Sequence, residues 1–255
     1  YVNYLAVLSK AFNGINGPNW RSTGMGRQMR QHRAAPTTFA VAVFQKKNIK
    51  IINGKPLIYW TIREAKKAKL KKIIVSTDSK KIANISKKYG AEVPFLRPKK
   101  ISQDSTKMID VLKHALNFFS KSKFFFKYIM ILQPTSPLRS HYDINKSIEL
   151  FNKFKKATSL VSLVSVEDNH PSRMYYLKKF YLNKNPLSEK KTGTIRQNLK
   201  KMYLRNGAIY IVDVKNLSRS LLGKKPIGYI MPDERSVNID RYFDFKIAEY
   251  LLKKF

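Results

Sequence analysis

Residues that can hold an anion or a hard cation lie at the ends of extended apolar runs and in short loops of this chain. Arg97 carries a planar guanidinium, which suits phosphate or carbonyl groups. Asn238 and Asp240 supply an amide oxygen and a carboxylate, both of which can ligate a hard cation such as Mg²⁺. Open α/β sheets bind ligands beyond the carboxyl ends of their strands, so polar residues at such ends are candidate site residues. Here they are Ser76, Thr77, Asp78, Gln133, Thr135, Ser136 and Arg139.

The elements that must position these residues alternate between strand and helix from residue 38 onward. This alternation predicts an α/β fold with a parallel-rich sheet that helices cover on both faces. Apolar residues at helical spacing, with capping signals such as Ser79, predict the helices, and short apolar runs predict the strands. The predicted strands span 38–44, 71–78, 127–133, 159–166 and 207–214, and the predicted helices span 57–70, 79–90, 105–122, 141–157 and 242–255.

Composition narrows the class of protein. The 255 residues are 43% hydrophobic, enough for one sizeable α/β domain, and the absence of cysteine excludes disulfides and thiolate metal sites. No apolar run approaches the roughly 20 residues that span a bilayer, so we expect a soluble, cytoplasmic protein with no membrane partner. The net charge of +35 would attract nucleic acid, but the lysines are scattered along predicted helices and no base-reading motif accompanies them. We therefore do not expect nucleic acid to be the partner.

A break in composition near residue 45 suggests how the chain is divided. Residues 1–45 contain one lysine, four arginines and no acidic residue, whereas lysine dominates from Lys46 onward. We expect an atypical N-terminal extension over 1–37, disordered or misannotated, and a catalytic-type domain over 38–255. An organelle transit peptide is the alternative for the extension, because it is acid-free and bears arginine.

Four segments follow one another in a specific order: KNIKIINGKPLI, IIVSTDSKKIANISKKYGAEVPFLRP, ILQPTSPLR, and NGAIYI followed by IMPDERSVNID. This ordered set resembles the acylneuraminate cytidylyltransferases over residues 46–255. The resemblance implies a Rossmann-like nucleotidyltransferase fold with a mostly parallel mixed sheet, and a homodimer in which 167–205 is a possible dimerisation element. It also implies a reaction in which CMP passes from CTP to a nine-carbon nonulosonic (sialic-type) keto acid, with Mg²⁺ present and pyrophosphate released.

The same resemblance assigns residues to the nucleotide and the metal. Asn48, Ser76, Thr77, Asp78 and Arg97 match the nucleotide side of the family site. Lys47 and Asp240 match catalytic positions, and Asp240 with Asn238 matches the metal-binding pair. Three other interpretations remain open: Asp78 or Ser79 caps a helix, Arg97 forms a surface ion pair, and Asp240 caps the last helix.

The acid-binding side is assigned in the same way. Gln133 matches a family glutamine that contacts the sugar acid, and Thr135, Ser136 and Arg139 surround it on a loop that two prolines constrain. Arg139 has a second interpretation, in which it ties the following helix to the loop. The resemblance adds two pairs, Arg196 with Gln197 and Arg205 with Asn206.

Two departures from the family pattern bear on catalysis. Relatives carry a loop of the form ARGGSKGIP before the KN pair, whereas here AVAVF runs to QKKN without glycine or arginine. Either this phosphate loop has been lost, or the first strand lies upstream in YLAVLSKAFNGINGP and a long insertion follows it; Lys10, Lys46 and Lys47 are candidate substitutes. The family metal motif DID reads NID here, which removes one negative charge. A noncatalytic or impaired relative is therefore the alternative function, ahead of a basic nucleic-acid-binding protein.

Overall fold

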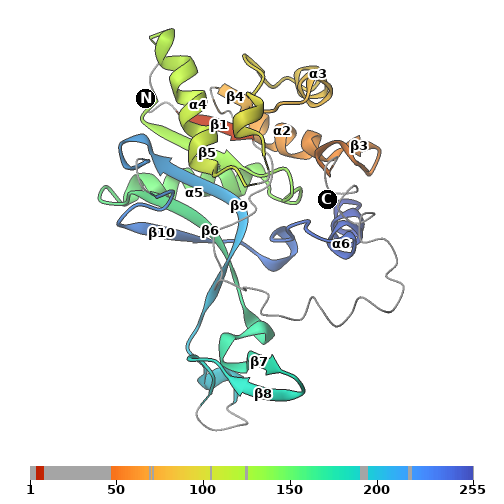
Figure 1. Cartoon of the computed structure of the whole chain (residues 1–255), viewed down its shortest axis with the longest axis vertical. Helices are drawn as coiled ribbons and strands as arrows, with labels where there is room; N and C mark the ends of the chain where they lie inside the picture. The colour runs from red at the N-terminus through yellow and green to blue at the C-terminus, as the bar shows by residue number, and fades with distance from the viewer. Residues whose placement is uncertain are drawn as a thin grey trace.

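The computed structural model describes residues 4–8, 47–68, 70, 72–103, 105–123, 126–189, 195–217 and 220–254. Its centre is a six-stranded sheet in the order β10-β6-β9-β5-β1-β4 (Figure 1). β1 pairs in parallel with β4 and β5, β10 pairs in parallel with β6, and β9 runs antiparallel to both β5 and β6. The strands are β1 (Tyr4–Leu8), β4 (Lys72–Val75), β5 (Tyr128–Leu132), β6 (Ser159–Ser165), β9 (Tyr203–Asp213) and β10 (Pro226–Ile230).

Helices cover both faces of this sheet, as the alternating pattern predicts. Side chains of one strand point alternately to the two faces, so Met130 and Leu132 of β5 pack with α2, α3 and α5, while Ile129 and Ile131 pack with α4. A third apolar cluster seats α6 against the start of α2 and against Leu138 and Ile239. The helices are α2 (Leu57–Lys67), α3 (Lys80–Lys88), α4 (Met108–Lys121), α5 (His141–Lys153) and α6 (Tyr242–Leu252).

Two hairpins lie outside the main sheet. The first joins β2 (Ile51–Ile52) to β3 (Lys55–Pro56) through Asn53 and Gly54, whose φ angles of 46° and 71° suit a tight turn, and it leads directly into α2. The second, β7 (Tyr175–Lys178) with β8 (Tyr181–Lys184), lies at the far end of the ribbon that β6 and β9 extend away from the sheet (Figure 1). We call the described residues 167–189 and 195–202 the arm.

Of the two candidates for the first strand, the upstream one lies in the main sheet. β1 lies between β4 and β5, where Ala6 is level with Ile73 on one side and with Met130 on the other. The sheet position next to β4 is therefore taken by residues 4–8, which belong to the sheet and not to an extension separate from it. The strand predicted over 38–44 and the rest of the segment 1–37 lie outside the described residues.

A proline at Val7 tests the central place of β1. Val7 is level with Ile74 of β4 and Ile131 of β5, and proline would remove a backbone donor from the middle of the sheet. We expect Val7→Pro to lower the free energy of unfolding by about 3 kcal/mol, measured by urea denaturation. Lys184→Pro, at the last residue of the exposed strand β8, is the control and should shift it by less than about 0.5 kcal/mol. Equal stability of Val7→Pro and the parent would contradict the strand assignment.

Candidate functional site

The carboxyl ends of β4, β1 and β5 meet at one edge of the sheet. Leu8 is level with Val75, and Val7 is level with Ile131, so the residues that follow β4 and β5 leave the sheet side by side. Gly207 of β9 lies at the same edge, because a Cβ placed on it would be 3.0 Å from Gln133 Oε1 and 4.0 Å from Asn238 Cγ. We call this edge, with Ser76, Gln133, Gly207 and Asn238, the mouth.

The loop from Gln133 to Arg139 is buried along its whole length. The Arg139 guanidinium lies inside it and donates to the carbonyl oxygens of Gln133 (3.2 Å) and Ala208 (2.8 Å), which ties the loop to β9. Burial lowers the pKa of Arg139 to about 10, although Asp143 and Glu64 act in the opposite direction. These contacts support the interpretation that Arg139 organises the loop. Its contact with a substrate remains a prediction.

Several buried polar atoms at the mouth have no hydrogen-bond partner among the described residues. They are Ser76 Oγ, Thr135 Oγ1, Ser136 Oγ and Asn238 Oδ1. Buried polar atoms in proteins are hydrogen-bonded in the large majority of cases, and an unmade bond costs about 1–3 kcal/mol. Their gathering at the edge of the sheet where α/β folds bind ligands indicates a site built for a polar ligand.

The segment with Asn238 and Asp240 is docked on this loop. The Ile239 amide donates to the Thr135 carbonyl oxygen at 2.8 Å, and Asn238 Nδ2 donates to Asp240 Oδ2 at 2.8 Å. Asp244 instead of Asp240 completes the cap of α6, because its carboxylate accepts from the Arg241 amide at 2.7 Å. The interpretation of Asp240 as the helix cap is therefore wrong. In the described part of the chain, no group of three or more histidine, cysteine or acidic side chains could hold a metal by itself.

Three of the predicted nucleotide residues meet at the end of β4. Arg97 NH2 lies 3.6 Å from Asp78 Oδ1, and the Arg97 amide donates to the Thr77 carbonyl oxygen at 2.8 Å. The Arg97 side chain is only 3% exposed and that of Asp78 is 42% exposed, so the ion pair of the alternative interpretation is present, with a buried arginine and an exposed carboxylate. Burial lowers the pKa of this guanidinium, and Asp78 partly restores it. The residue that caps α3 is Ser79, not Asp78. The Asp78 carboxylate pairs with Arg97.

The remaining residues on the nucleotide side lie at the start of the domain. Asn48 is half-buried in a short 3₁₀ helix, Lys47–Ile49, and the residue after that helix, Lys50, accepts a backbone hydrogen bond from Leu57 of α2. The Lys47 side chain, Lys10 and Lys46 lie outside the described residues. The roles predicted for Lys47 and Asn48 remain predictions.

The two pairs assigned to the acid lie on β9 and on the arm. Asn206 makes internal bonds: its Oδ1 accepts from Ser162 Oγ at 2.6 Å, and its Nδ2 donates to Ser236 Oγ at 3.0 Å. Arg205 precedes it within β9 and is half-buried. Gln197 is exposed on a 3₁₀ helix of the arm, Arg196–Asn198, and the side chain of Arg196 lies outside the described residues. Among the described residues, no contact brings Gln197 to the mouth.

A buried ionic network beside the mouth was missed by sequence reasoning. Asp143, fully buried, accepts two hydrogen bonds from Arg235, at 2.9 and 3.0 Å, and one from the Tyr229 hydroxyl at 3.1 Å. It also forms a capping box with Ser140 at the start of α5. Burial acts to raise the pKa of Asp143, but bonds from Arg235 and Ser140 lower it below its usual value. Burial and Asp143 raise the pKa of Tyr229 to about 12.

The pattern Ser-x-x-Asp before an apolar run is the sequence signal that could have predicted the capping box of Ser140 and Asp143.

Glu64 of α2 adds a second carboxylate at the start of α5. Its Oε2 accepts from the His141 amide at 2.9 Å and lies 2.9 Å from His141 Nδ1, while its Oε1 accepts from Arg63 Nε at 2.7 Å. Burial acts to raise the pKa of Glu64, but the bonds from His141 and Arg63 lower it. An anion at a helix N-terminus is stabilised by the helix dipole, so Glu64 holds α2 against the helix that follows the loop.

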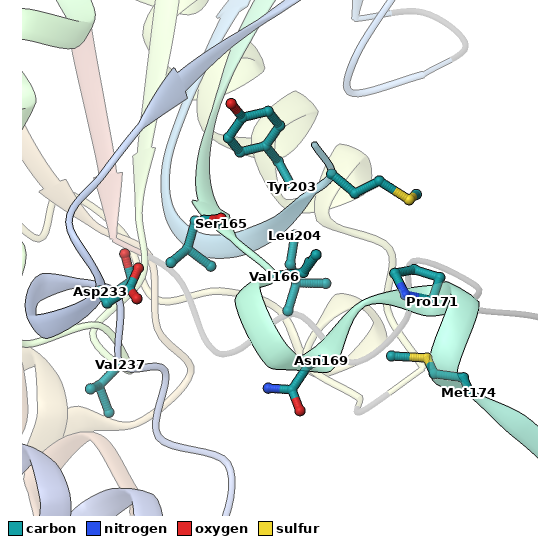
Figure 2. A pocket seen from close by; sticks show the side chains of 12 residues that line it. Ser165, Val166, Asn169, Pro171, Met174, Tyr203, Leu204, Asp233 and Val237 are labelled. Atoms are coloured by element: carbon teal, nitrogen blue, oxygen red, sulfur yellow. The ribbon is translucent and has the colours of Figure 1, made fainter. Parts of the chain in front are cut away.

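A pocket of about 410 Å³ lies where the arm meets the sheet. Figure 2 shows Asp233 and Val237 on one side of it, and Pro171 and Met174 on the other. Val237, which lines the pocket, directly precedes Asn238 of the mouth in the sequence. Its lining is mainly apolar and comprises Val164, Ser165, Val166, Asn169, Pro171, Met174, Met202, Tyr203, Leu204, Asp233, Ser236 and Val237.

Comparisons with known proteins agree with this geometry. The chain is 34% identical to post-translational flagellin modification protein B of Campylobacter coli, over 82% of this chain and 89% of the relative. It is 29% identical to CMP-N,N'-diacetyllegionaminic acid synthase of Legionella pneumophila, over 81% of this chain and 89% of the relative. A solved structure of CMP:2-keto-3-deoxy-manno-octonic acid synthetase complexed with CTP matches 99% of both chains with a TM-score of 0.63 at 12% identity, which confirms the α/β nucleotidyltransferase fold.

A family model described as cytidylyltransferase matches residues 44–242, more than half of the chain. These findings confirm the resemblance read from the four ordered motifs, and the chain belongs to the cytidylyltransferase family.

Proposed function

We propose that this protein transfers CMP from CTP to a nonulosonic acid and releases pyrophosphate. One observation carries the proposal: unpartnered, buried polar atoms gather at the carboxyl edge of the sheet, in a chain whose family transfers cytidylyl groups. The relatives named above include a synthase of a CMP-linked nonulosonic acid, which supports the class of acceptor. The proposal places the protein in the cytoplasm, where CTP is available.

The two sides of the mouth divide the work between the substrates. Both substrates are anions, so the site must offset negative charge while it aligns the attacking oxygen with the phosphorus atom. We assign the nucleotide to the β4 side, where Arg97 is held by Asp78, and the acid to the β5 side, where Gln133 lies beside Thr135 and Ser136. The apolar pocket beyond Val237 suits acyl substituents of the acid.

We propose that Mg²⁺ binds at Asp240 and Asn238. The Asp240 carboxylate is exposed and the Asn238 Oδ1 atom is buried without a partner among the described residues, so both are oxygen ligands of the kind this ion prefers. The bound ion would supply positive charge to the phosphate oxygens of CTP. The amide in place of a carboxylate leaves the site with one negative charge fewer, which predicts weaker metal binding than a pair of aspartates would give.

We propose that the segment that follows β1 binds the triphosphate of CTP. β1 ends at Leu8, level with the ends of β4 and β5, so the chain leaves the sheet at the mouth. Lys10 and two glycines, Gly14 and Gly17, follow within ten residues, and glycines allow a backbone to approach phosphate closely. Lys46 and Lys47 remain further candidates for this role.

Pyrophosphate release tests the function directly. With CTP, Mg²⁺ and a panel of sialic, legionaminic and pseudaminic acids, we expect release with at least one acid and none when the acid is left out. Asp240→Asn, which removes the remaining carboxylate, should reduce the rate by at least tenfold, the equivalent of about 1.4 kcal/mol. Calorimetric binding of CTP without release from any acid would favour the noncatalytic relative instead.

A substitution at Gly207 tests the place of the acid. Gly207 has a φ of +75°, and an added Cβ would lie 3.0 Å from Gln133 Oε1, so Gly207→Ala should displace that side chain and raise KM for the acid about tenfold. Gly54→Ala is a matched control, because its φ is +71° but its Cβ would meet nothing within 4 Å. Both variants should lose about 1 kcal/mol of stability, and only Gly207→Ala should alter KM. The same KM in both would remove Gln133 from the acid site.

We also propose that the arm forms a homodimer. The hairpin β7–β8 exposes Leu177, Tyr181 and Leu182, and Phe180 at its turn is 94% exposed. Leu177 and Leu182 lie opposite each other and so share one face of the hairpin. We call these four exposed side chains the patch; exposed apolar side chains of this kind are typical of a protein interface, because their burial on association is favourable. The patch lies at the end of the arm farthest from the main sheet (Figure 1), so a partner could cover it without blocking the mouth.

Charge placed in this patch should separate the subunits. We expect light scattering to give the mass of a dimer for the parent and of a monomer for the double variant Phe180→Asp, Leu182→Asp, because burying two unpaired carboxylates is strongly unfavourable. Phe154→Asp, at an exposed aromatic residue after α5, is the control and should leave the dimer intact. A parent protein that is monomeric at micromolar concentration would refute the assignment.

A further inference from the structure

Two separate segments bring residues to the mouth, and one buried ion pair joins them. The first is the loop 133–139, which leads into α5. The second is the segment 231–240, which carries Asn238 and Asp240 and leads into α6. Asp143 belongs to the first turn of α5, and Arg235 belongs to the second segment.

We propose that Asp143 and Arg235 act as a positioning clamp, which fixes Asp240 relative to Gln133 and so sets the distance between the metal side and the acid side of the mouth. This inference rests on the proposed function. Neither residue is assigned a contact with substrate; both act through the segments that they join.

The geometry of the pair suits a clamp. Arg235 Nε lies 2.9 Å from Asp143 Oδ2 and its NH2 lies 3.0 Å from Oδ1, so the guanidinium and carboxylate meet through two parallel bonds that fix distance and direction together. The carboxylate cannot rotate freely, because Oδ2 also accepts from the Ser140 amide and hydroxyl at 2.9 and 2.7 Å, while Oδ1 accepts from Tyr229. Asp143 is therefore a fixed point to which the second segment is attached.

Further contacts hold the second segment between Arg235 and α6, among them the burial of Ile239 in the apolar cluster under α6. The Ile239 amide donates to the Thr135 carbonyl oxygen, and the Ser236 hydroxyl accepts from Asn206. The clamp lies three residues before Asn238 and five before Asp240. Loss of the clamp would remove one of the contacts that hold this segment on the loop 133–139, so the bond from the Ile239 amide to Thr135 would open more often.

Stability alone is a poor explanation for this pair. The desolvation of a fully buried carboxylate offsets much of its attraction to a cation, and apolar replacements of buried ion pairs are often neutral or stabilising. The gain from such a pair lies in a fixed arrangement, because a misplacement of about 1 Å in a site can cost about 100-fold in rate. A lysine at 235 would keep the charge but lose the planar two-bond contact.

Hydrogen exchange tests the clamp without substrate. In Arg235→Lys, we expect the Ile239 amide to exchange at least tenfold faster than in the parent, while amides of β5 and β9 keep their rates. Glu234→Gln is the matched control, because Glu234 contacts the same guanidinium at 3.7 Å from the solvent side and leaves the Asp143 contact intact. Unchanged exchange at Ile239 in Arg235→Lys would overturn the inference.

Kinetics test the consequence for the reaction. We expect kcat/KM for the acid to fall at least tenfold in Arg235→Lys, while calorimetric affinity for CTP measured without Mg²⁺ stays within twofold. A purely structural role would lower the melting temperature and leave kcat/KM per folded molecule unchanged. Tyr229→Phe, which removes one donor and keeps both arginine bonds, should show a smaller loss than Arg235→Lys.

The double variant Asp143→Asn, Arg235→Met guards against misfolding, because it removes both charges and leaves neither unpaired. We expect it to fold, with the same fast exchange at Ile239 as Arg235→Lys. Slow exchange in a folded double variant would contradict the clamp. If the parent releases no pyrophosphate with any acid, the proposed function fails, whereas the exchange experiment still decides the inference.

Discussion

The level alignment of β1 with its two parallel neighbours is the constraint on which the site depends. Because β4, β1 and β5 all end at the same height, three connections leave the sheet at one edge, and polar residues distant in the sequence become neighbours. The antiparallel strand β9 then supplies Gly207, whose missing side chain leaves room for Gln133. A shift of β1 by one residue would turn its own side chains to the opposite faces of the sheet and move its end out of line with Val75 and Ile131.

Several charged side chains meet around the start of α5, beside this edge. The Arg139 guanidinium lies in the interior, Asp143 and Glu64 approach the same helix terminus from α5 and α2, and Arg235 closes the group from the second segment. Each ion is costly to bury alone, and each is offset by a hydrogen-bonded neighbour of opposite charge or by carbonyl oxygens. The loop 133–139, α2 and the segment with Arg235 are thereby linked through the start of α5.

Much of the fold could be predicted from sequence because local patterns decided it. Ser79 caps its helix as predicted, and the strands around Met130 and Tyr210 follow from short apolar runs. The antiparallel place of β9 is not visible in such patterns, since strand direction depends on contacts between distant residues. The first strand was ambiguous for a similar reason: the sequence offers two apolar runs, 4–8 and 38–44, and it is the pairing with β4 and β5 that assigns the place between them to residues 4–8.

The site could be predicted in part, through motifs that mark which residues gather at the mouth. Sequence could not show that the Asn206 amide is hydrogen-bonded to Ser162 and Ser236, or that Arg139 donates to main-chain oxygens. These bonds join residues that are distant in the sequence and meet only in the folded interior. The ion pair of Asp143 and Arg235 joins positions 92 residues apart, and no local pattern announces such a contact. The resemblance named the candidate site residues, and the packing of the folded chain determines which contacts each of them makes.

The hydrogen bond between Asn238 and Asp240 has a consequence for the shape of the segment that carries them. Two carboxylates so near to each other would repel until a cation arrived, and the segment would then depend on that cation for its shape. An amide that donates to its neighbour removes the repulsion, so the pair holds itself together. The shape of the segment 238–240 therefore comes from its own side chains, and the Mg²⁺ site that we propose there would not need the ion for its assembly.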